Sequence, residues 1–158
     1  MKKKFFWNFF FILTVFLLDR VSKISIINLL ENSDNGHIQV TNFLSFNLIW
    51  NEGIAFGLFS FDQELYYNFL TIIIILVTTI ILWMIIKTKG LEKIAFLMIF
   101  GGSLGNIFDR LVYSSVPDFI DLHYNNFNWF IFNVADIFIS IGIILLIYLE
   151  FFKKKINE

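Results

Sequence analysis

The feature best suited to chemistry is an acidic side chain at the start of a long apolar run. Asn133 and Asp136 directly precede residues 137–152, which are almost entirely apolar. An aspartate at the centre of a membrane helix costs roughly 2.5 to 3.5 kcal/mol, so an acid placed near the hydrocarbon usually serves a function. The three-residue spacing of Asn133 and Asp136 is also typical of a helix N-cap pair. Both interpretations are open at this point.

The composition indicates a membrane protein. Of the 158 residues, 58% are hydrophobic and only 16% are charged, which argues against a soluble domain and against nucleic-acid binding. Nine of the twelve basic residues form three clusters, at residues 2–4, 87–93 and 153–155, and such clusters mark the cytoplasmic side of membrane helices. Without cysteine the chain has no disulfide, no thiol nucleophile and no lipid-modified cysteine of its own.

The apolar runs predict a polytopic, all-α membrane protein with a single domain at residues 1–158. Four transmembrane helices are expected at about residues 5–25, 67–87, 92–111 and 135–153, with both termini cytoplasmic. Outer loops are expected at residues 26–66 and 112–134. The first apolar run has no small-x-small site after it, so we expect an uncleaved span rather than a removed signal peptide.

The first outer loop contains the clearest signs of other structure. Residues 44–50 alternate apolar and polar side chains, which predicts a short extracytoplasmic strand. Gly53 and Gly57 follow Asn51 and suit either a plain turn or a binding loop. Residues 58–68 are mildly amphipathic and are expected to form a helix at the outer interface.

Polar residues on three of the expected helices fall at one depth. Counting ~1.5 Å per residue from the cytoplasmic end of each run places Asp19 at ~21 Å, Asn106 at ~18 Å, Asp109 at ~22 Å and Asp136 at ~24 Å. Independent helix caps do not predict this agreement, whereas a single polar site inside the bundle does. Asp19 and Lys23 are four residues apart and should form an ion pair on one helix face.

Three other kinds of site are compatible with parts of the sequence. Residues 101–105 match the G-x-S-x-G pattern of serine hydrolases, but Ser103 has no histidine near it in the expected topology. Asp118, Asp121 and His123 could bind a metal, although an outer loop offers no rigid ligand framework. Intramembrane acids also occur in small transporters, but these acids stop at one depth and no inverted repeat is evident. A pair of carboxylates that activates water is the remaining chemistry.

With these residues assembled, the sequence resembles the lipoprotein signal peptidase (signal peptidase II) family, the membrane aspartyl proteases of bacteria. The family motif D-x-x-[ST]-K matches residues 19–23, N-x-G-x-A-F-G matches residues 51–57, and G-G-A-x-G-N-x-x-D-R matches residues 101–110. The segment around the family's first catalytic aspartate matches residues 116–121, and F-N-x-A-D matches residues 132–136. Ser103 replaces the usual alanine. The match covers nearly the whole chain.

The resemblance implies an endopeptidase that removes signal peptides from diacylglyceryl-modified prolipoproteins and cleaves on the N-terminal side of the lipidated cysteine. It implies a catalytic pair, Asp118 and Asp136, and a monomer that needs no cofactor or metal and contacts membrane lipids. The enzyme would lie in the bacterial cytoplasmic (inner) membrane with its active site near the extracytoplasmic face, under a small sheet from the first loop. The residues implied to shape the site or contact substrate are Asp19, Lys23, Asn51, Gly102, Asn106, Arg110, Asn133 and Ala135.

Overall fold

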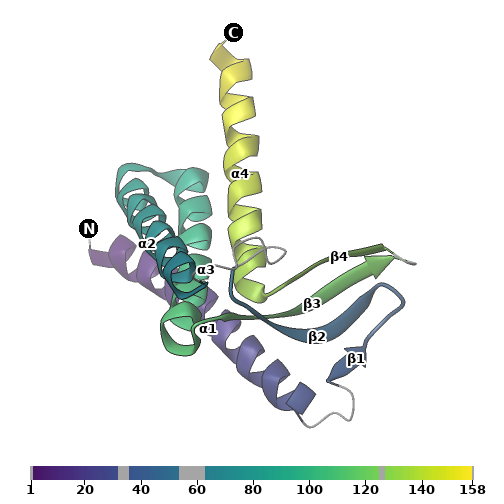
Figure 1. Cartoon of the computed structure of the whole chain (residues 1–158). Coiled ribbons are helices and arrows are strands. Elements are labelled where there is room, and N and C mark those ends of the chain that lie inside the picture. The colour runs from purple at the N-terminus through teal and green to yellow at the C-terminus, as the bar shows by residue number, and fades with distance from the viewer. Residues whose placement is uncertain (1, 32–35, 54–62, 125–126, 158) are drawn as a thin grey trace.

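The described residues form four long helices and a four-stranded sheet (Figure 1). This computed structural model describes residues 2–31, 36–53, 63–124 and 127–157. The helices are α1 (Lys2–Glu31), α2 (Gln63–Lys87), α3 (Gly90–Tyr113) and α4 (Val134–Asn157). The strands are β1 (His37–Gln39), β2 (Leu44–Asn51), β3 (Val116–Tyr124) and β4 (Phe127–Phe132).

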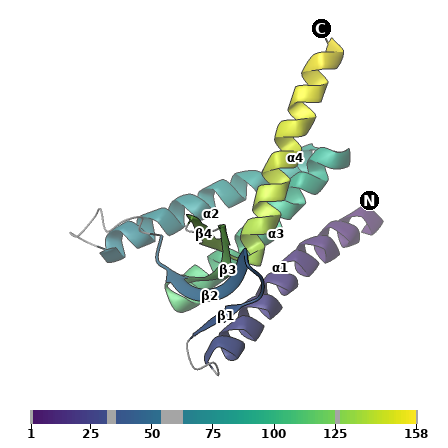
Figure 2. The ribbon, with the colours of Figure 1, turned by 90° about the vertical axis from the view of Figure 1, so that its right-hand side faces the viewer.

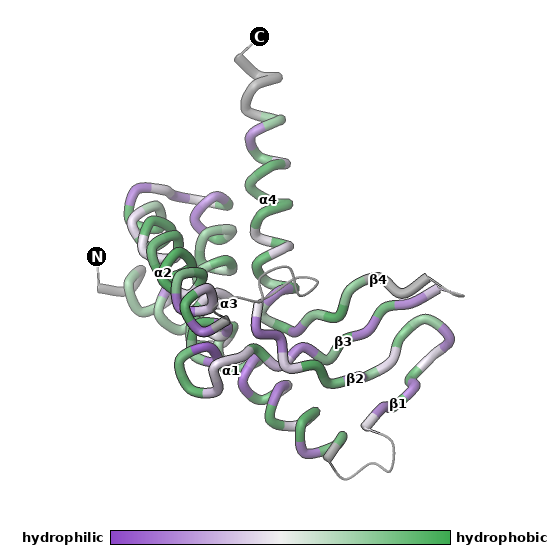
Figure 3. The backbone as a smooth tube through the Cα atoms, viewed as in Figure 1, coloured by the Kyte–Doolittle hydropathy of each residue, from purple (hydrophilic) through white to green (hydrophobic). Residues whose placement is uncertain are grey.

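Three helices in the described part are long and apolar enough to cross a membrane. These segments are Glu64–Lys87, Gly90–Tyr113 and Val134–Phe152. Figure 3 shows α2 hydrophobic along nearly its whole length, with hydrophilic residues at its turn into α3. A helix suits such segments because hydrocarbon offers no partner for an unpaired backbone group. The α1 helix has 30 residues and carries Asp19, Arg20 and Lys23 in its apolar stretch, so its crossing remains a prediction.

The α3 helix lies at the centre of the helical part and contacts α1, α2 and α4. It approaches α1 closely because Gly101 has no side chain: a Cβ atom there would lie 2.8 Å from the Cβ of Val15. Small residues allow this closeness in membrane helices, where van der Waals packing replaces the hydrophobic effect. Away from the sheet, α1 and α4 diverge from each other (Figure 2).

All strand pairs in the sheet are antiparallel, in the order β1-β2-β3-β4. The strand predicted at residues 44–50 is confirmed as β2. The sheet was expected to come from the first outer loop, but residues 112–134 supply two of its four strands, β3 and β4. Of the interfacial helix expected at residues 58–68, residues 63–68 belong to α2, and residues 58–62 lie outside the described residues.

The sheet follows the C-terminal end of α3 and precedes the N-terminal end of α4, so it lies beside both of these helix ends. Ser114 has a φ of 55°, a left-handed C-cap that ends α3 and lets the chain turn into β3. β4 then runs into α4 with Asn133 as the connecting residue. The N-terminal end of α1, the turn between α2 and α3, and the C-terminal end of α4 lie away from the sheet (Figures 1 and 2).

Candidate active site

Asn133 joins the two aspartates that the sequence singled out. Its side-chain amide donates to Asp118 Oδ1 at 2.6 Å, and its backbone N–H donates to Asp136 Oδ2 at 3.0 Å. Asn133 is completely buried between β4 and α4, so its position is fixed from both sides. Both carboxylates therefore meet at one asparagine, at the junction of the sheet with α4.

Asp118 is held at the start of β3 by two amide donors. Asn51 on the neighbouring strand donates from Nδ2 to Asp118 Oδ2 at 2.8 Å, opposite the bond from Asn133. Asn51 pairs with Val116, which lies two residues before Asp118 on β3. Residues two apart on a strand point to the same face, so the side chains of Asn51 and Asp118 lie on one face of the sheet. A register irregularity between Phe46 and Ile49 precedes this pair, and such bulges often re-aim side chains beside active sites.

Burial changes the acidity of Asp118. Asp118 is only 4% exposed, and the resulting desolvation raises the pKa of its carboxyl group to about 6. The amides of Asn51 and Asn133 stabilise the charged form and lower that pKa, whereas the nearby charge of Asp136 raises it further. Asp118 therefore binds a proton more readily than an exposed aspartate does.

Asp136 lies in the first turn of α4 and forms the predicted cap with Asn133. The Asp136 N–H donates to Asn133 Oδ1 at 3.1 Å, which completes the reciprocal pair. The second carboxylate oxygen, Oδ1, accepts a hydrogen bond from Asn106 Nδ2 of α3 at 2.8 Å. The cap interpretation is thus confirmed, and the same carboxylate also belongs to a polar cluster that spans three helices.

Lys23 is the centre of that cluster. Its Nζ atom contacts Asp19 Oδ2 at 2.9 Å, Asn106 Oδ1 at 2.9 Å and Asp109 Oδ2 at 2.6 Å. Lys23 is only 1% exposed, so these three acceptors replace water. The predicted ion pair of Asp19 and Lys23 is confirmed, as is the convergence of polar residues from α1, α3 and α4.

Arg20 is a member of this cluster that the sequence analysis missed. Its guanidinium contacts Asp109 Oδ1 at 2.6 Å and Asp19 Oδ2 at 3.2 Å, and it lies over the Phe108 ring at 5.0 Å. A count of charges could have identified Arg20, because Asp19 and Asp109 carry two negative charges and Lys23 supplies only one positive charge. Arg20 brings the four-residue group to zero net charge.

Asp19 also supports the helix that carries Asp136. Its Oδ1 atom accepts the backbone N–H of Ala135 at 3.0 Å, in the first turn of α4, where a negative charge is favoured by the helix dipole. Gly105 allows this approach, because a Cβ at that position would lie 2.5 Å from Asp19 Oδ2. The α1 helix thereby fixes the N-terminal end of α4 as well as Lys23.

Gly102 is the point where α3 touches the start of α4. A Cβ at residue 102 would lie 2.6 Å from the backbone oxygen of Ala135. Gly102→Ala must therefore push the two helices apart, and we expect it to lower the free energy of unfolding by about 1 to 3 kcal/mol. Thermal unfolding in detergent measures this loss. Ser103→Ala, one residue along, removes only a hydroxyl and is the matched control; equal stability of the two variants would contradict this packing.

Arg110 lies at the edge of the site, and part of its guanidinium group makes no hydrogen bond to the described residues. Its guanidinium stacks over the Tyr67 ring at 5.4 Å, and its buried Nε and Nη1 atoms have no hydrogen-bond partner among the described residues. Gly53 lies beside it, since a Cβ there would be 3.2 Å from Arg110 Nη1. Residues 54–57 of the predicted glycine motif lie outside the described residues.

Two alternatives lose their geometric support. Ser103 lies in the middle of α3, whereas a nucleophile elbow requires a sharp turn from a strand into a helix. Asp118, Asp121 and His123 lie on one strand, and no cluster of three possible metal ligands occurs within the described residues. Asp121 instead accepts a hydrogen bond from Ser45 Oγ at 3.3 Å.

The arrangement is suited to acid–base chemistry. Two carboxylates share one neighbour, and every carboxylate oxygen of the pair already accepts one hydrogen bond. Asp118 is buried, whereas Asn51 is exposed and Asp136 is half-buried, so one side of the pair faces out of the protein. Buried paired carboxylates of this kind can share a proton and activate water.

Comparison with known proteins identifies the family. A family model described as signal peptidase (SPase) II matches residues 11–152. A lipoprotein signal peptidase of Pelagibacter ubique is 49% identical over 158 residues, which cover 99% of this chain and 95% of the relative. One of Aquifex aeolicus is 42% identical over 144 residues, which cover 89% of this chain and 83% of the relative.

A solved structure of a membrane enzyme has a similar fold. A bacterial membrane enzyme determined by the in meso method at 2.3 Å resolution superposes with a TM-score of 0.77 at 29% identity, covering 96% of this chain and 90% of that one. The family match spans most of the chain and includes Asp118 on β3 and Asp136 in the first turn of α4. The chain therefore belongs to the lipoprotein signal peptidase family, the proteases that remove signal peptides from prolipoproteins.

Proposed function

We propose that this protein is an aspartic endopeptidase in which Asp118 and Asp136 form the catalytic pair. The observation that carries the proposal is the double attachment of Asn133, whose side chain bonds Asp118 and whose backbone bonds Asp136. Capping α4 alone does not require the hydrogen bond from the Asn133 side chain to Asp118. The substrate is a prolipoprotein with a diacylglyceryl cysteine, and the bond cleaved is the one on the N-terminal side of that cysteine.

Water is the nucleophile in this mechanism. The pair holds one proton, because two adjacent carboxylates resist ionising together. The ionised carboxylate takes a proton from water as the water oxygen attacks the scissile carbonyl carbon, while the protonated partner donates a hydrogen bond to the carbonyl oxygen. The tetrahedral intermediate then breaks its C–N bond, and the cysteine amine leaves with a proton from the pair.

The other site residues position this pair and the substrate. Asn51, Asn106 and Asn133 orient the carboxylates through the bonds described above. Arg110 has two donors without a partner among the described residues, next to Gly53, and is suited to bind a carbonyl oxygen of the substrate backbone. Asp19, Lys23, Gly102 and Ala135 hold α1, α3 and α4 in register beneath the pair.

The topology we propose has four spans, including α1, and the protein acts as a monomer in the bacterial inner membrane. The lysine clusters at residues 2–4, 87–93 and 153–155 belong to helix ends that lie away from the sheet, which supports their cytoplasmic placement. The aspartates then lie near the outer face, where lipid tails can stay in the bilayer while the peptide bond reaches water.

Thiol labelling of single cysteines introduced at residues 36 and 89 in intact cells tests this topology. Only the cysteine at residue 36 should react with a reagent added from outside.

The pH dependence of cleavage follows from the shared proton. Raising the pH removes that proton, so kcat/KM should fall at pH values near or above the pKa of about 6 that burial gives Asp118. Asn51→Ala removes a donor that stabilises the charged carboxylate, which raises the pKa of Asp118. The falling limb should therefore move to higher pH in that variant. A limb that stays in place or moves to lower pH would contradict the role given to Asp118.

A further inference from the structure

Tyr67, near the start of α2, contacts Arg110 in two ways. Its hydroxyl group donates to the backbone oxygen of Arg110 at 3.2 Å, and the Arg110 guanidinium lies over its ring, with Cζ 5.4 Å from the ring centroid. A guanidinium within about 6 Å of an aromatic ring is attracted by the ring electrons. One side chain of α2 therefore holds both the main chain and the charged group of Arg110.

The hydrogen bond from Tyr67 fixes the end of α3 against α2. Tyr67 is only 9% exposed, and the hydroxyl group of a buried tyrosine needs a partner. Arg110 lies in the last turn of α3, where backbone carbonyl groups run short of partners within the helix. The bond satisfies both groups, and it determines the position from which the Arg110 side chain extends.

The ring of Tyr67 and Gly53 enclose the Arg110 guanidinium. A Cβ atom at Gly53 would lie 3.2 Å from Arg110 Nη1 and 2.7 Å from Leu70 Cδ2, so only a glycine fits there without displacing a neighbour. Arg110 Nε and Nη1 are buried and have no hydrogen-bond partner among the described residues. Because buried polar groups are usually paired in folded proteins, these two donors are suited to a ligand.

Gly53 also connects Arg110 with the aspartate pair. The Gly53 N–H donates to Asn51 Oδ1 at 2.7 Å, and Asn51 Nδ2 donates to Asp118 Oδ2 at 2.8 Å. The guanidinium therefore lies beside the segment that holds Asp118. A peptide backbone bound at the pair would pass next to Gly53 and could reach the donors of Arg110.

We propose that Tyr67 is a positioning residue, which holds the Arg110 guanidinium in the orientation that binds a carbonyl oxygen of the substrate. This inference rests on the proposed function, because it assumes that Arg110 binds the substrate backbone. Fixing a long side chain before the substrate arrives lowers the entropic cost of binding. Tyr67 acts only through Arg110, and the reaction at Asp118 and Asp136 does not involve it.

Steady-state cleavage of a diacylglyceryl precursor in detergent tests this role. Tyr67→Phe keeps the ring and loses the hydroxyl group, whereas Tyr67→Leu loses both contacts with Arg110. We expect KM to rise roughly 2- to 5-fold in Tyr67→Phe and roughly 5- to 20-fold in Tyr67→Leu. The kcat value should stay nearly unchanged, because the lost contacts affect binding equally before and during the chemical step.

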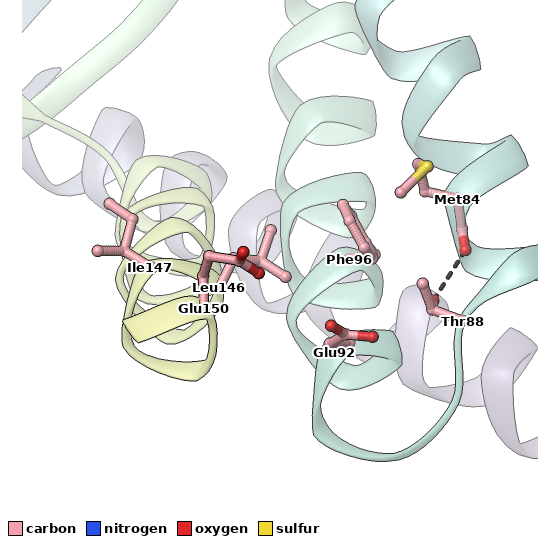
Figure 4. Close-up of a pocket in the computed structure, with 7 residues that line it drawn as sticks. All are labelled: Met84, Thr88, Glu92, Phe96, Leu146, Ile147 and Glu150. Atoms are coloured by element: carbon pink, nitrogen blue, oxygen red, sulfur yellow. Dashed lines mark hydrogen bonds between the residues drawn. The ribbon is translucent and has the colours of Figure 1, made fainter. Parts of the chain in front are cut away.

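Thr88 provides the matched control for loss of a hydroxyl group. It lines a cavity between α2, α3 and α4 at the helix ends away from the sheet, and its hydroxyl group donates to the backbone oxygen of Met84 at 2.8 Å (Figure 4). Thr88→Val thus removes the same kind of bond as Tyr67→Phe, far from Arg110. This variant should keep the KM and kcat of the wild type.

A double-mutant cycle separates this role from general support of the fold. It is measured as the Kd of the same precursor for full-length enzyme that carries Asp136→Asn, so that cleavage does not interfere. Arg110→Met should raise Kd at least as much as Tyr67→Leu does. Adding Tyr67→Leu to Arg110→Met should then change Kd by less than about 2-fold, because the group that Tyr67 positions is already absent.

The outcomes distinguish this inference from the proposed function. A wild-type KM in Tyr67→Phe, a lower kcat at unchanged KM, or equal effects of Tyr67→Leu with and without Arg110 would overturn the inference and leave the peptidase assignment intact. A wild-type Kd in Arg110→Met would overturn it together with the role given to Arg110. Cleavage by Asp136→Asn at the wild-type rate would contradict the catalytic pair, and the KM of Tyr67→Phe would still decide the role of Tyr67.

Discussion

Asp136→Asn lowers the rate of signal-peptide cleavage at least ~10³-fold, as expected for loss of a general acid or base from a coupled pair. The amide cannot accept a proton from water or carry the shared proton. The fold should survive, because the asparagine side chain keeps one acceptor oxygen for the backbone N–H of Asn133, and an amide can serve as the N3 partner of a capping box. The measurement is single-turnover cleavage of a diacylglyceryl precursor, with thermal unfolding of the same sample.

A neighbouring aspartate supplies the control for this experiment. Asp121 lies on β3 three residues after Asp118, and its carboxylate contacts Ser45 instead of the pair. Asp121→Asn should therefore cleave at close to the wild-type rate. The assignment of Asp136 would be refuted if its asparagine variant, folded to the wild-type extent, cleaved as fast as Asp121→Asn.

Lys23→Met is expected to lower the free energy of unfolding by about 3 to 5 kcal/mol. The methionine fills the same space, but it leaves the carboxylates of Asp19 and Asp109 with one cation, Arg20, in a buried site. Removing one partner of a buried ion pair is far more costly than removing an exposed charge. Unfolding in a denaturing detergent measures the change.

Two comparison variants give this prediction its specificity. Lys87→Met removes a lysine whose charge lies over the Trp83 ring at a helix end, and its cost should stay within about 0.5 kcal/mol. Lys23→Met combined with Asp109→Asn restores neutrality, so the double variant should be more stable than the sum of its single effects predicts. Additive losses would mean that Lys23 and Asp109 do not interact in the folded protein.

The helical part of the site was predictable because helix geometry is regular. A rise of ~1.5 Å per residue placed Asp19, Asn106, Asp109 and Asp136 in one layer, and the observed contacts among them with Lys23 follow from that. The spacing of Asn133 and Asp136 likewise predicted the cap. Both relations depend only on the number of residues between two positions of one helix or between a residue and its helix end, and the sequence gives these numbers directly.

The sheet was only half predictable. The alternation at residues 44–50 identified β2, but β3 contains Pro117 and a mixed apolar and polar pattern, which is typical of loops and edge strands. β3 pairs with β2 across about 70 residues of sequence, and such pairing leaves no local signal. The contact of Asn51 with Asp118 depends on that pairing, so only the family resemblance pointed to it.

The attachment of Asn133 to both aspartates was also beyond reach of the sequence. Its dual role requires β4 to deliver it beside β3 while α4 begins at the next residue. Arg20 was missed for a different reason: it lies one residue from Asp19, and adjacent helical residues are not expected to face a common partner. Its long side chain nevertheless reaches both Asp19 and Asp109.

The central claim is that Asp118 and Asp136 act as one unit on a water molecule. Single-turnover cleavage of one diacylglyceryl precursor by Asp118→Asn, Asp136→Asn and the double variant, each shown to be folded, tests it most directly. Residues that act as a unit are strongly non-additive, so all three variants should be inactive to about the same extent. Substantial cleavage by either single variant, or a double variant slower by the product of the two losses, would contradict the account.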